Sequence, residues 1–197
     1  MKRILESGQF SNYREGVSLD SASMEVANLY KSYFGKTTVF ISHKHDDLED
    51  LSGFIGFLEK NYNVKAYIDS KDSSMPSVTS GVTASKIKER IRQCDKFILL
   101  ATDGAVESKW CNWELGYGDS QKFSSKDIAI LPLKRKGYSD SSYKGNEYMQ
   151  IYPYIAYYDG MEFYRDRTPV QRGYYVVTED EKGNHTINSL RDWLNNH

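Results

Sequence analysis

The chain has 197 residues, of which 39% are hydrophobic and 27% are charged, as is typical of a globular protein. This length suits one domain with additional segments and is short for two domains. The 26 basic and 27 acidic residues give a net charge of -1, which indicates neither a nucleic acid nor a membrane surface as a partner. No apolar run approaches the roughly 18 residues of a membrane span, which argues against a transmembrane protein.

The two cysteines, Cys94 and Cys111, lie in apolar segments and lack the spacing of a metal site. We interpret them as reduced thiols, which predicts a cytoplasmic location. Residues 1–16 begin with basic residues but contain no apolar core, so the sequence does not predict a secretory signal.

Helical and strand patterns alternate between residues 18 and 133, after a polar segment, 1–17, that we expect to be loosely ordered. Apolar residues at helical spacing predict helices at 18–34, 46–63 and 81–94. The side chains expected to face the core from the last two helices are Leu48, Leu51, Ile55, Leu58, Val82, Ile87 and Ile91. Short β-branched or aromatic runs predict strands at 37–42, 64–69, 95–102 and 127–133. The strand at 95–102 is apolar throughout and is expected at the centre of the sheet.

The periodicity is weaker after Pro132. The sequence predicts a fifth strand within 152–158, then an irregular or hairpin segment around 173–177. A closing amphipathic helix is expected to carry Ile187, Leu190, Trp193 and Leu194.

Many of the sixteen tyrosines fall between residues 138 and 175. Tyrosine combines a large apolar ring with a hydroxyl group that needs a partner, so clusters of it favour half-buried surfaces and interfaces. Two interpretations stay open. The rings close the edge of the sheet, or part of this segment, including Tyr174 and Tyr175, forms a surface for self-association or for a partner.

Strands that alternate with helices predict a parallel sheet covered on both faces. Right-handed crossovers and short connections favour a flavodoxin-like, doubly wound sheet of five parallel strands. We expect an α/β core over 36–158, an N-terminal helical extension over 1–35, and a Tyr-rich C-terminal elaboration over 159–197. Ligands of such sheets bind outside the carboxyl ends of the strands, where this chain has polar segments.

A metal site was considered at His43 and His45, which could face the same way, with Asp46 or Asp47 as oxygen ligands. The other two histidines lie in the C-terminal tail. We therefore predict no metal site and expect a solvated turn in which one of the two aspartates caps the next helix.

Other catalytic motifs are missing from the sequence. The turn after the first predicted strand has no phosphate-binding glycine loop, which disfavours Rossmann-type dinucleotide binding. No G-x-S-x-G motif occurs, and neither cysteine has a suitably placed histidine, so a nucleophilic triad is not predicted.

The segment "SKWCNWELGYG" (108–118) places Glu114 four residues after Trp110, on the same face of a helix. Most glutamates in amphipathic helices are surface residues, but this one follows a strand end, and Asp69 ends the neighbouring strand. An aromatic ring beside an acid suits a cationic planar ring attached to a sugar. The indole packs against the ring, and the carboxylate stabilises positive charge that develops on the sugar.

Four segments resemble, in order and spacing, the successive blocks of a TIR (Toll/interleukin-1 receptor) domain. They are "TTVFISHKHDD", "VKAYIDSKDSSMPS", "IRQCDKFILLATDGAVESKWCNWELGYG" and "DIAILPL". The most specific part is the W-C-x-x-E-L block, which contains Trp110, Cys111, Glu114 and Leu115. The resemblance covers roughly residues 36–158 and implies the TIR form of the flavodoxin-like fold.

The resemblance implies that the chain cleaves the nicotinamide–ribose bond of NAD⁺, as a substrate and without a further cofactor. In TIR domains that act on NAD⁺, the glutamate at the position of Glu114 is catalytic. The resemblance also implies substrate-binding residues, which are Trp110, His43, Lys44, His45 and Asp69. Because many relatives have tyrosine or arginine in the first loop, the individual roles of the two histidines stay open.

The fate of the ADP-ribosyl group also stays open: ADP-ribose, a cyclic isomer or a conjugate could form. Similar bacterial stand-alone TIR proteins act in anti-phage defence, some through a product nucleotide that a separate effector protein recognises. The resemblance further implies self-association through the BB loop, here 70–81. Two alternatives remain, a non-catalytic TIR scaffold and a nucleoside 2-deoxyribosyltransferase-like enzyme.

Overall fold

The computed structural model describes residues 4–17, 35–69, 80–140, 147–180 and 182–196. The helix expected at 18–34 and most of the BB loop lie outside the described residues. Within the described part, no helix is both long and apolar enough to cross a membrane.

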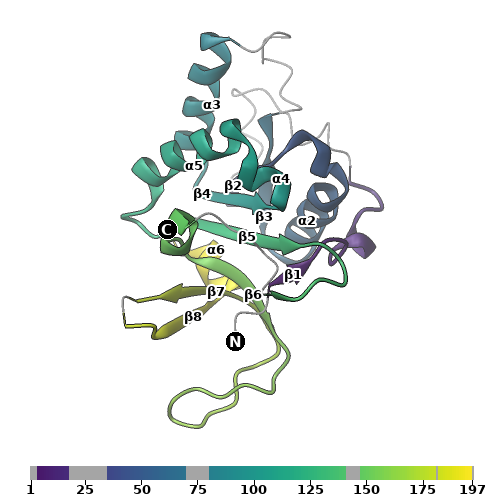
Figure 1. The fold of residues 1–197 in the computed structure, drawn as a ribbon, viewed down its shortest axis with the longest axis vertical. Coiled ribbons are helices and arrows are strands. Elements are labelled where there is room, and N and C mark those ends of the chain that lie inside the picture. Colours follow the sequence, from purple (N-terminus) through teal and green to yellow (C-terminus); the bar gives the residue numbers. More distant parts are fainter. Residues whose placement is uncertain (1–3, 18–34, 70–79, 141–146, 181, 197) are drawn as a thin grey trace.

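Five parallel strands form the centre of the sheet, in the spatial order β3-β2-β4-β5-β6 (Figure 1). They are β2 (Thr37–Ser42), β3 (Val64–Tyr67), β4 (Lys96–Ala101), β5 (Ile128–Lys134) and β6 (Tyr154–Tyr158). This order is the 2-1-3-4-5 arrangement of flavodoxin-like folds. β4 lies in the middle with every residue buried, so the predicted fold class and the central strand are confirmed.

The sheet continues beyond the five predicted strands, to eight in the described part. β7 (Gly173–Glu179) pairs antiparallel with β6, and β8 (His185–Ser189) pairs antiparallel with β7. At the other end of the chain, β1 (Leu5–Glu6) pairs with β5. The hairpin expected near 173–177 is therefore present as part of the sheet.

The closing helix, α6 (Leu190–Asn195), begins later than expected. Ile187 belongs to β8, where it pairs with Val177. The helix starts after Ser189, whose hydroxyl accepts a hydrogen bond from the backbone N–H of Asp192. The start of the helix is set by this strand pairing and this cap, and both are contacts of the folded chain. Leu190, Trp193 and Leu194 are buried, as predicted.

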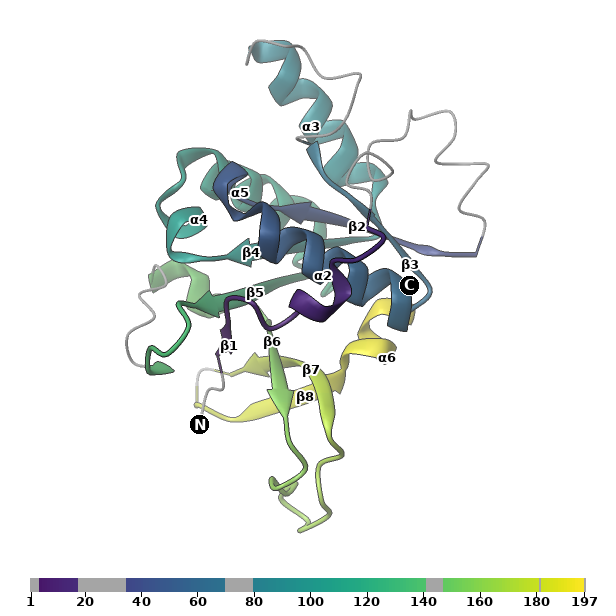
Figure 2. The same ribbon diagram turned by 90° about the vertical axis from the view of Figure 1, so that its right-hand side faces the viewer.

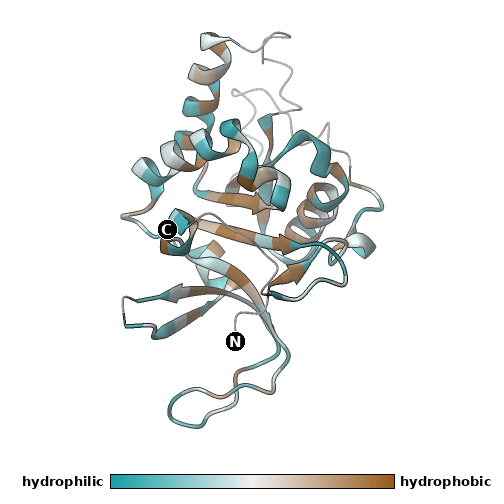
Figure 3. Cartoon of the chain, viewed as in Figure 1, coloured by the Kyte–Doolittle hydropathy of each residue, from teal (hydrophilic) through white to brown (hydrophobic). Residues whose placement is uncertain are grey.

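Helices cover both faces of the parallel strands (Figures 1 and 2). α2 (Leu48–Asn61) and α6 pack on one face, while α3 (Gly81–Gln93), α4 (Asp103–Glu107) and α5 (Lys109–Lys122) pack on the other. Figure 3 shows hydrophobic residues concentrated in the central strands between these layers. Most predicted core residues are buried, but Val82 is 58% exposed because α3 begins beyond the edge of the sheet (Figure 1).

The N-terminal segment is ordered from Ile4 to Val17, contrary to the expectation of a loose lead-in. Phe10 is 2% exposed and lies against Phe54 and Phe57 of α2. Two glycines of α2 allow the close approach. A Cβ atom at Gly53 would lie 2.7 Å from the carbonyl oxygen of Phe10, and one at Gly56 would lie 2.1 Å from that of Tyr13.

Tyr174 is partly buried and Tyr175 is buried, and both rings pack within the sheet. The ring of Tyr174 packs against Phe57 at 4.7 Å and Tyr157 at 5.1 Å. Tyr175 is 8% exposed and donates a hydrogen bond of 2.9 Å to the carbonyl oxygen of Gln171. For these two residues the structure favours the structural interpretation over a partner surface.

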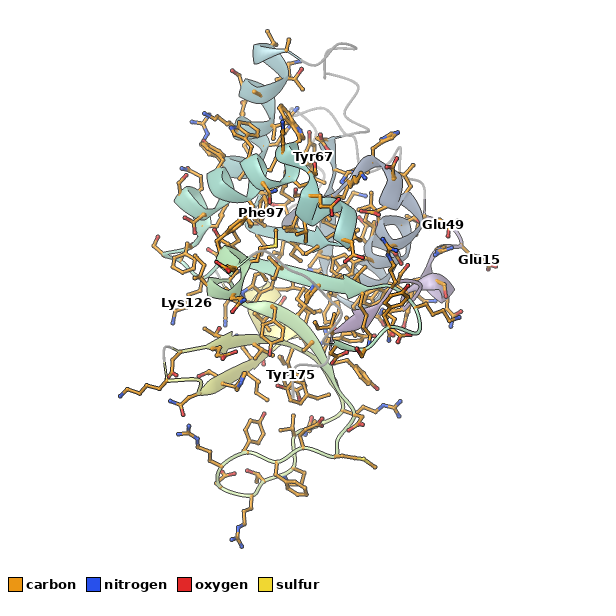
Figure 4. The ribbon with its side chains drawn as sticks, viewed as in Figure 1. Glu15, Glu49, Tyr67, Phe97, Lys126 and Tyr175 are labelled. Atoms are coloured by element: carbon orange, nitrogen blue, oxygen red, sulfur yellow. The ribbon has the colours of Figure 1, made fainter. Side chains whose placement is uncertain are left out.

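Residues 159–172, which we call the arm, join β6 to β7 and project away from the helices (Figures 1 and 2). Hydrogen bonds from the backbone N–H of Val170 to Glu162 and from that of Tyr164 to Thr168 hold the arm as a narrow hairpin. Tyr175 lies near its base (Figure 4). β6 pairs with β7, so the sheet is continuous across the boundary predicted at residue 158. The division of the chain at that residue stays a prediction.

Candidate active site

The short helix α4 follows the carboxyl end of β4, and α5, which carries Glu114, begins directly after α4. Thr102 caps α4, and Ser108 caps α5 by accepting a hydrogen bond from the backbone N–H of Cys111. The buried face of α5 consists of Cys111, Glu114, Leu115 and Gly118. Glu114 therefore occupies a core-facing position of the helix, where an apolar side chain is the usual choice.

Glu114 is 1% exposed and touches the end of β2. Its Oε2 accepts a hydrogen bond of 2.5 Å from the hydroxyl of Ser42, which is fully buried. Its Oε1 is also buried and has no hydrogen-bond partner among the described residues. A buried carboxyl oxygen without a partner is costly, so its presence calls for a functional explanation.

The surroundings of Glu114 disfavour its ionised form. Burial raises the pKa of this carboxyl well above its usual range, and the negative charge of Asp69 raises it further. The hydrogen bond from Ser42 opposes both effects. Trp110 also lowers the pKa, although the geometry between the two side chains falls short of a hydrogen bond. The carboxyl thus keeps its proton to higher pH than an ordinary glutamate, unless positive charge appears beside it.

Trp110 is partly exposed and lies one helical turn before Glu114. Its ring stacks on Trp113 with centroids 4.9 Å apart, and Trp113 in turn stacks on Tyr117. Lys88 of α3 lies over the rings of Trp113 and Tyr117. These contacts fix the indole beside the buried acid, so Trp110 can offer a rigid aromatic surface to a planar ligand.

His43 and Asp69 lie in the same cluster as Glu114. Asp69 follows β3, is partly buried, and acts electrostatically on both Glu114 and His43. His43 is 7% exposed, and its Nδ1 lies 3.3 Å from the carbonyl oxygen of Ile41. Burial lowers the pKa of His43, and Asp69 partly offsets that effect. The ends of β2 and β3 therefore place His43 and Asp69 beside Glu114.

Lys44 and His45 are more exposed than His43. The Lys44 ammonium pairs with Asp46 at 3.3 Å, and its side chain packs against Gly104 of α4. His45 is exposed on the short helix η3 (His45–Asp47). The extended conformation ends at Lys44, so the strand alternation that could bring His43 and His45 to one side does not continue to His45.

The predicted cap of α2 is correct in position but lacks the capping hydrogen bond. Asp47 occupies the N-cap position, but its side chain makes no capping hydrogen bond. Instead, its Oδ2 accepts a hydrogen bond of 2.6 Å from the hydroxyl of Thr102 and so links the loops after β2 and β4. Across the described ranges, no group of three His, Cys, Asp or Glu side chains is placed to hold a metal ion.

Ser42 is the residue of this cluster that sequence reasoning missed. It is the last residue of β2 and directly follows the apolar residues 39–41. A hydroxyl in that place is the available signal, because a buried hydroxyl needs a partner.

Both cysteines are buried and free, in agreement with the prediction of reduced thiols. Burial raises the pKa of Cys111 to about 11 and that of Cys94 to about 12. Thiols with such pKa values carry little thiolate near neutral pH, so neither is suited to act as a nucleophile. Cys111 contributes packing next to Glu114 and Ser42.

Comparison with known proteins agrees with this fold. The family model described as "TIR domain" matches residues 39–165. A curated relative, "Probable 3' cyclic ADP-D-ribose synthase ThsB'" from Bacillus cereus (strain MSX-D12), is 33% identical over 120 residues, which are 60% of this chain and 60% of that protein. The similarity thus spans less than two thirds of the relative. Because the family match covers more than half of the sequence, the chain belongs to the TIR domain family.

Proposed function

We propose that this protein cleaves NAD⁺ at the bond between nicotinamide and ribose, with Glu114 as the catalytic residue. The observation that carries the proposal is a fully buried carboxyl whose Oε1 lacks a partner, next to the indole of Trp110. A buried acid with an unpaired oxygen destabilises the free protein. The acid and the indole together suit a ligand that brings a planar cation and develops positive charge on a sugar.

The proposed step is the heterolysis of the N-glycosidic bond. The bonding electron pair passes to the ring nitrogen, so the nicotinamide leaves as a neutral molecule and the ribose becomes oxocarbenium-like. Ionised Glu114, supported by Asp69, stabilises that positive charge in a site with little water. Burial disfavours the carboxylate in the free protein, so its interaction with the sugar is strongest when positive charge develops there. An interaction that is stronger in the transition state than in the ground state accelerates the reaction.

The other residues hold the reactants in place. Ser42 fixes Oε2 of Glu114 by its hydrogen bond and so leaves Oε1 for the sugar. Trp110 packs against the nicotinamide ring. His43 and Asp69 line the opposite side of the site, and Lys44 and His45 line it at the start of the loop that follows β2.

The name of the Bacillus cereus relative favours a cyclic product over hydrolysis. We therefore propose that a hydroxyl of the ADP-ribosyl group, and not water, captures the ribose, and that the product is a signal nucleotide for a separate effector in anti-phage defence. A cytoplasmic location and self-association through 70–81 are further parts of the proposal. The latter predicts specific activity that rises with protein concentration.

Incubation with NAD⁺, followed by chromatography and mass spectrometry, tests the proposal. We expect nicotinamide and a product lighter than ADP-ribose by one water, the mass of a cyclic isomer. ADP-ribose itself would support hydrolysis. Base exchange on a deoxynucleoside, with no nicotinamide released from NAD⁺, would instead support the deoxyribosyltransferase alternative. No turnover of either compound across a wide range of protein concentrations would favour the scaffold.

A further inference from the structure

A cavity of about 1230 Å³ lies between the arm and the β7–β8 hairpin, among residues that the proposed reaction does not use. Tyr154, Tyr158 and Ile187 line it from the sheet. The buried residues of α6 belong to the hydrophobic cluster on one face of the sheet, and these three residues belong to the cluster on the other face. α6 therefore packs on the face of β7 and β8 opposite the cavity. The cavity is thus an open aromatic surface of the sheet with the arm as one wall (Figure 4).

The arm exposes apolar side chains that nothing in the described part of the chain covers. Met161 is 78% exposed and Phe163 is 65% exposed. Phe163 pairs with Pro169, which is also exposed, so these residues lie close together on the hairpin. Tyr164, Thr168 and other arm residues line the cavity. Large exposed apolar groups on a projecting element are typical of an interaction surface.

Size and charge indicate what fits the cavity. Its volume exceeds the roughly 300–1,000 Å³ of a small-molecule site, which favours a polypeptide segment. The cavity is lined by the acids Glu162, Asp166 and Asp180 and by Arg165, and all of these except Asp180 belong to the arm. The exposed tip of the arm carries a second arginine, Arg167. The arm therefore presents apolar groups and charges of both signs, so it is complementary to the arm of a second copy in a two-fold contact.

We propose that the arm of one copy of this chain occupies the cavity of a second copy, so that two arms interlock around a two-fold axis. In a two-fold dimer each copy supplies the same groups, so the arm and the cavity are both used twice. Met161 and Phe163 then cover the partner's aromatic sheet surface, and Arg167 lies near the partner's acidic side chains. The dimer does not depend on NAD⁺ cleavage. β7 and β8 lie outside the family match at 39–165, whereas Met161 and Phe163 lie near its end.

Sedimentation velocity of the full chain without NAD⁺, over a range of protein concentrations, tests the dimer. We expect a monomer–dimer equilibrium whose dissociation constant rises at least about tenfold in the double variant Met161→Ser/Phe163→Ser. Tyr138→Ser/Ile151→Ser is the matched control, because these residues are 54% and 59% exposed outside the arm. Arg167→Glu should also weaken the dimer, and added salt should weaken its contribution. Melting temperatures establish that each variant is folded.

Cross-linking identifies the contact itself. A chain with Phe163→Cys is mixed with a chain that carries Tyr158→Cys, and both are oxidised gently. We expect a disulfide-linked heterodimer in the mixture and little product from either chain alone. The proposal is overturned if the protein is monomeric up to about 100 μM. It is equally overturned if dimers form but the arm variants and the control behave alike, which would place the contact elsewhere.

Discussion

The carboxyl groups of Glu114 and of Asp180 in the arm cavity differ in burial and in hydrogen bonding. Glu114 is buried, with one oxygen that lacks a partner and a pKa raised by burial. Asp180 in the cavity accepts hydrogen bonds from Lys182 and Asn184 of its own turn, and these lower its pKa. Asp180 is therefore satisfied by its own turn, which suits a binding surface. Glu114 keeps an oxygen without a hydrogen-bond partner, which suits chemistry, so the volume of the arm cavity alone would point to the wrong region.

Removal of one hydroxyl should affect the two regions very differently. Ser42→Ala deprives Oε2 of Glu114 of its hydrogen bond and should lower the rate of NAD⁺ cleavage by about 10²-fold. Because this hydrogen bond lowers the Glu114 pKa, its loss should move the rising limb of the pH–rate profile to higher pH. Steady-state kinetics across pH measure both effects.

The matched change in the cavity is Thr186→Ala, since Thr186 lines it without a contact to the Glu114 site. Its rate and pH profile should equal those of the unmodified protein when the two are compared at the same degree of assembly. Equal losses in Ser42→Ala and Thr186→Ala would remove the distinction between the regions.

Substitution of two tyrosines compares the folded core with the arm by the loss of stability that each change causes. Tyr174 packs against Phe10, Phe57 and Tyr157, so Tyr174→Ser should lower the free energy of unfolding by about 2–3 kcal/mol. Tyr164, which is 43% exposed in the cavity, should lose at most about 0.5 kcal/mol in Tyr164→Ser. Urea unfolding at low protein concentration measures both. A similar loss for the two variants would mean that the arm is part of the folded core.

The smallest expected effects are changes of stability with pH, of opposite sign. The Glu114 pKa is higher in the folded state, so this carboxyl destabilises the fold as pH rises above the ordinary glutamate pKa. The melting temperature of Glu114→Gln should therefore rise relative to that of the unmodified protein as pH rises above about 4.5. The amide can still accept the hydrogen bond from Ser42.

Asp180 provides the opposite case with the same carboxyl-to-amide change. Its folded pKa is lowered, so its stabilising effect is present above the ordinary aspartate pKa and is lost as pH falls through the folded value. Asp180→Asn should therefore lower the melting temperature at neutral pH and have less effect in acid. Thermal melts between pH 3 and 8 compare the two variants, and a loss of stability in Glu114→Gln at neutral pH would contradict the account of that site.

Local sequence patterns were sufficient for the parallel core and for part of the site. The apolar strands and the W-C-x-x-E-L block depend on neighbours in the chain, and they predicted β2 to β6 and the position of Glu114. Contacts distant in sequence were not readable. Phe10 is ordered because Gly53 and Gly56 leave room for it. Ser42 matters because α5 brings Glu114 to it, from 72 residues away.

Turns and edges account for the other errors. His45 leaves the strand direction in a short helix, and Ile187 joins β8 because β7 is there to pair with it. Neither outcome follows from the periodicity of the segment itself, since pairing and turn geometry depend on the folded partner.

Release of nicotinamide from NAD⁺ by Glu114→Gln is the most direct test of the central claim. The control is Glu107→Gln, which alters an exposed glutamate of the neighbouring helix α4. At a pH and temperature where both variants are folded, we expect Glu114→Gln to be slower than the unmodified protein by at least about 10³-fold, and Glu107→Gln to be unchanged. Nicotinamide release by Glu114→Gln at the rate of the unmodified protein would contradict the account.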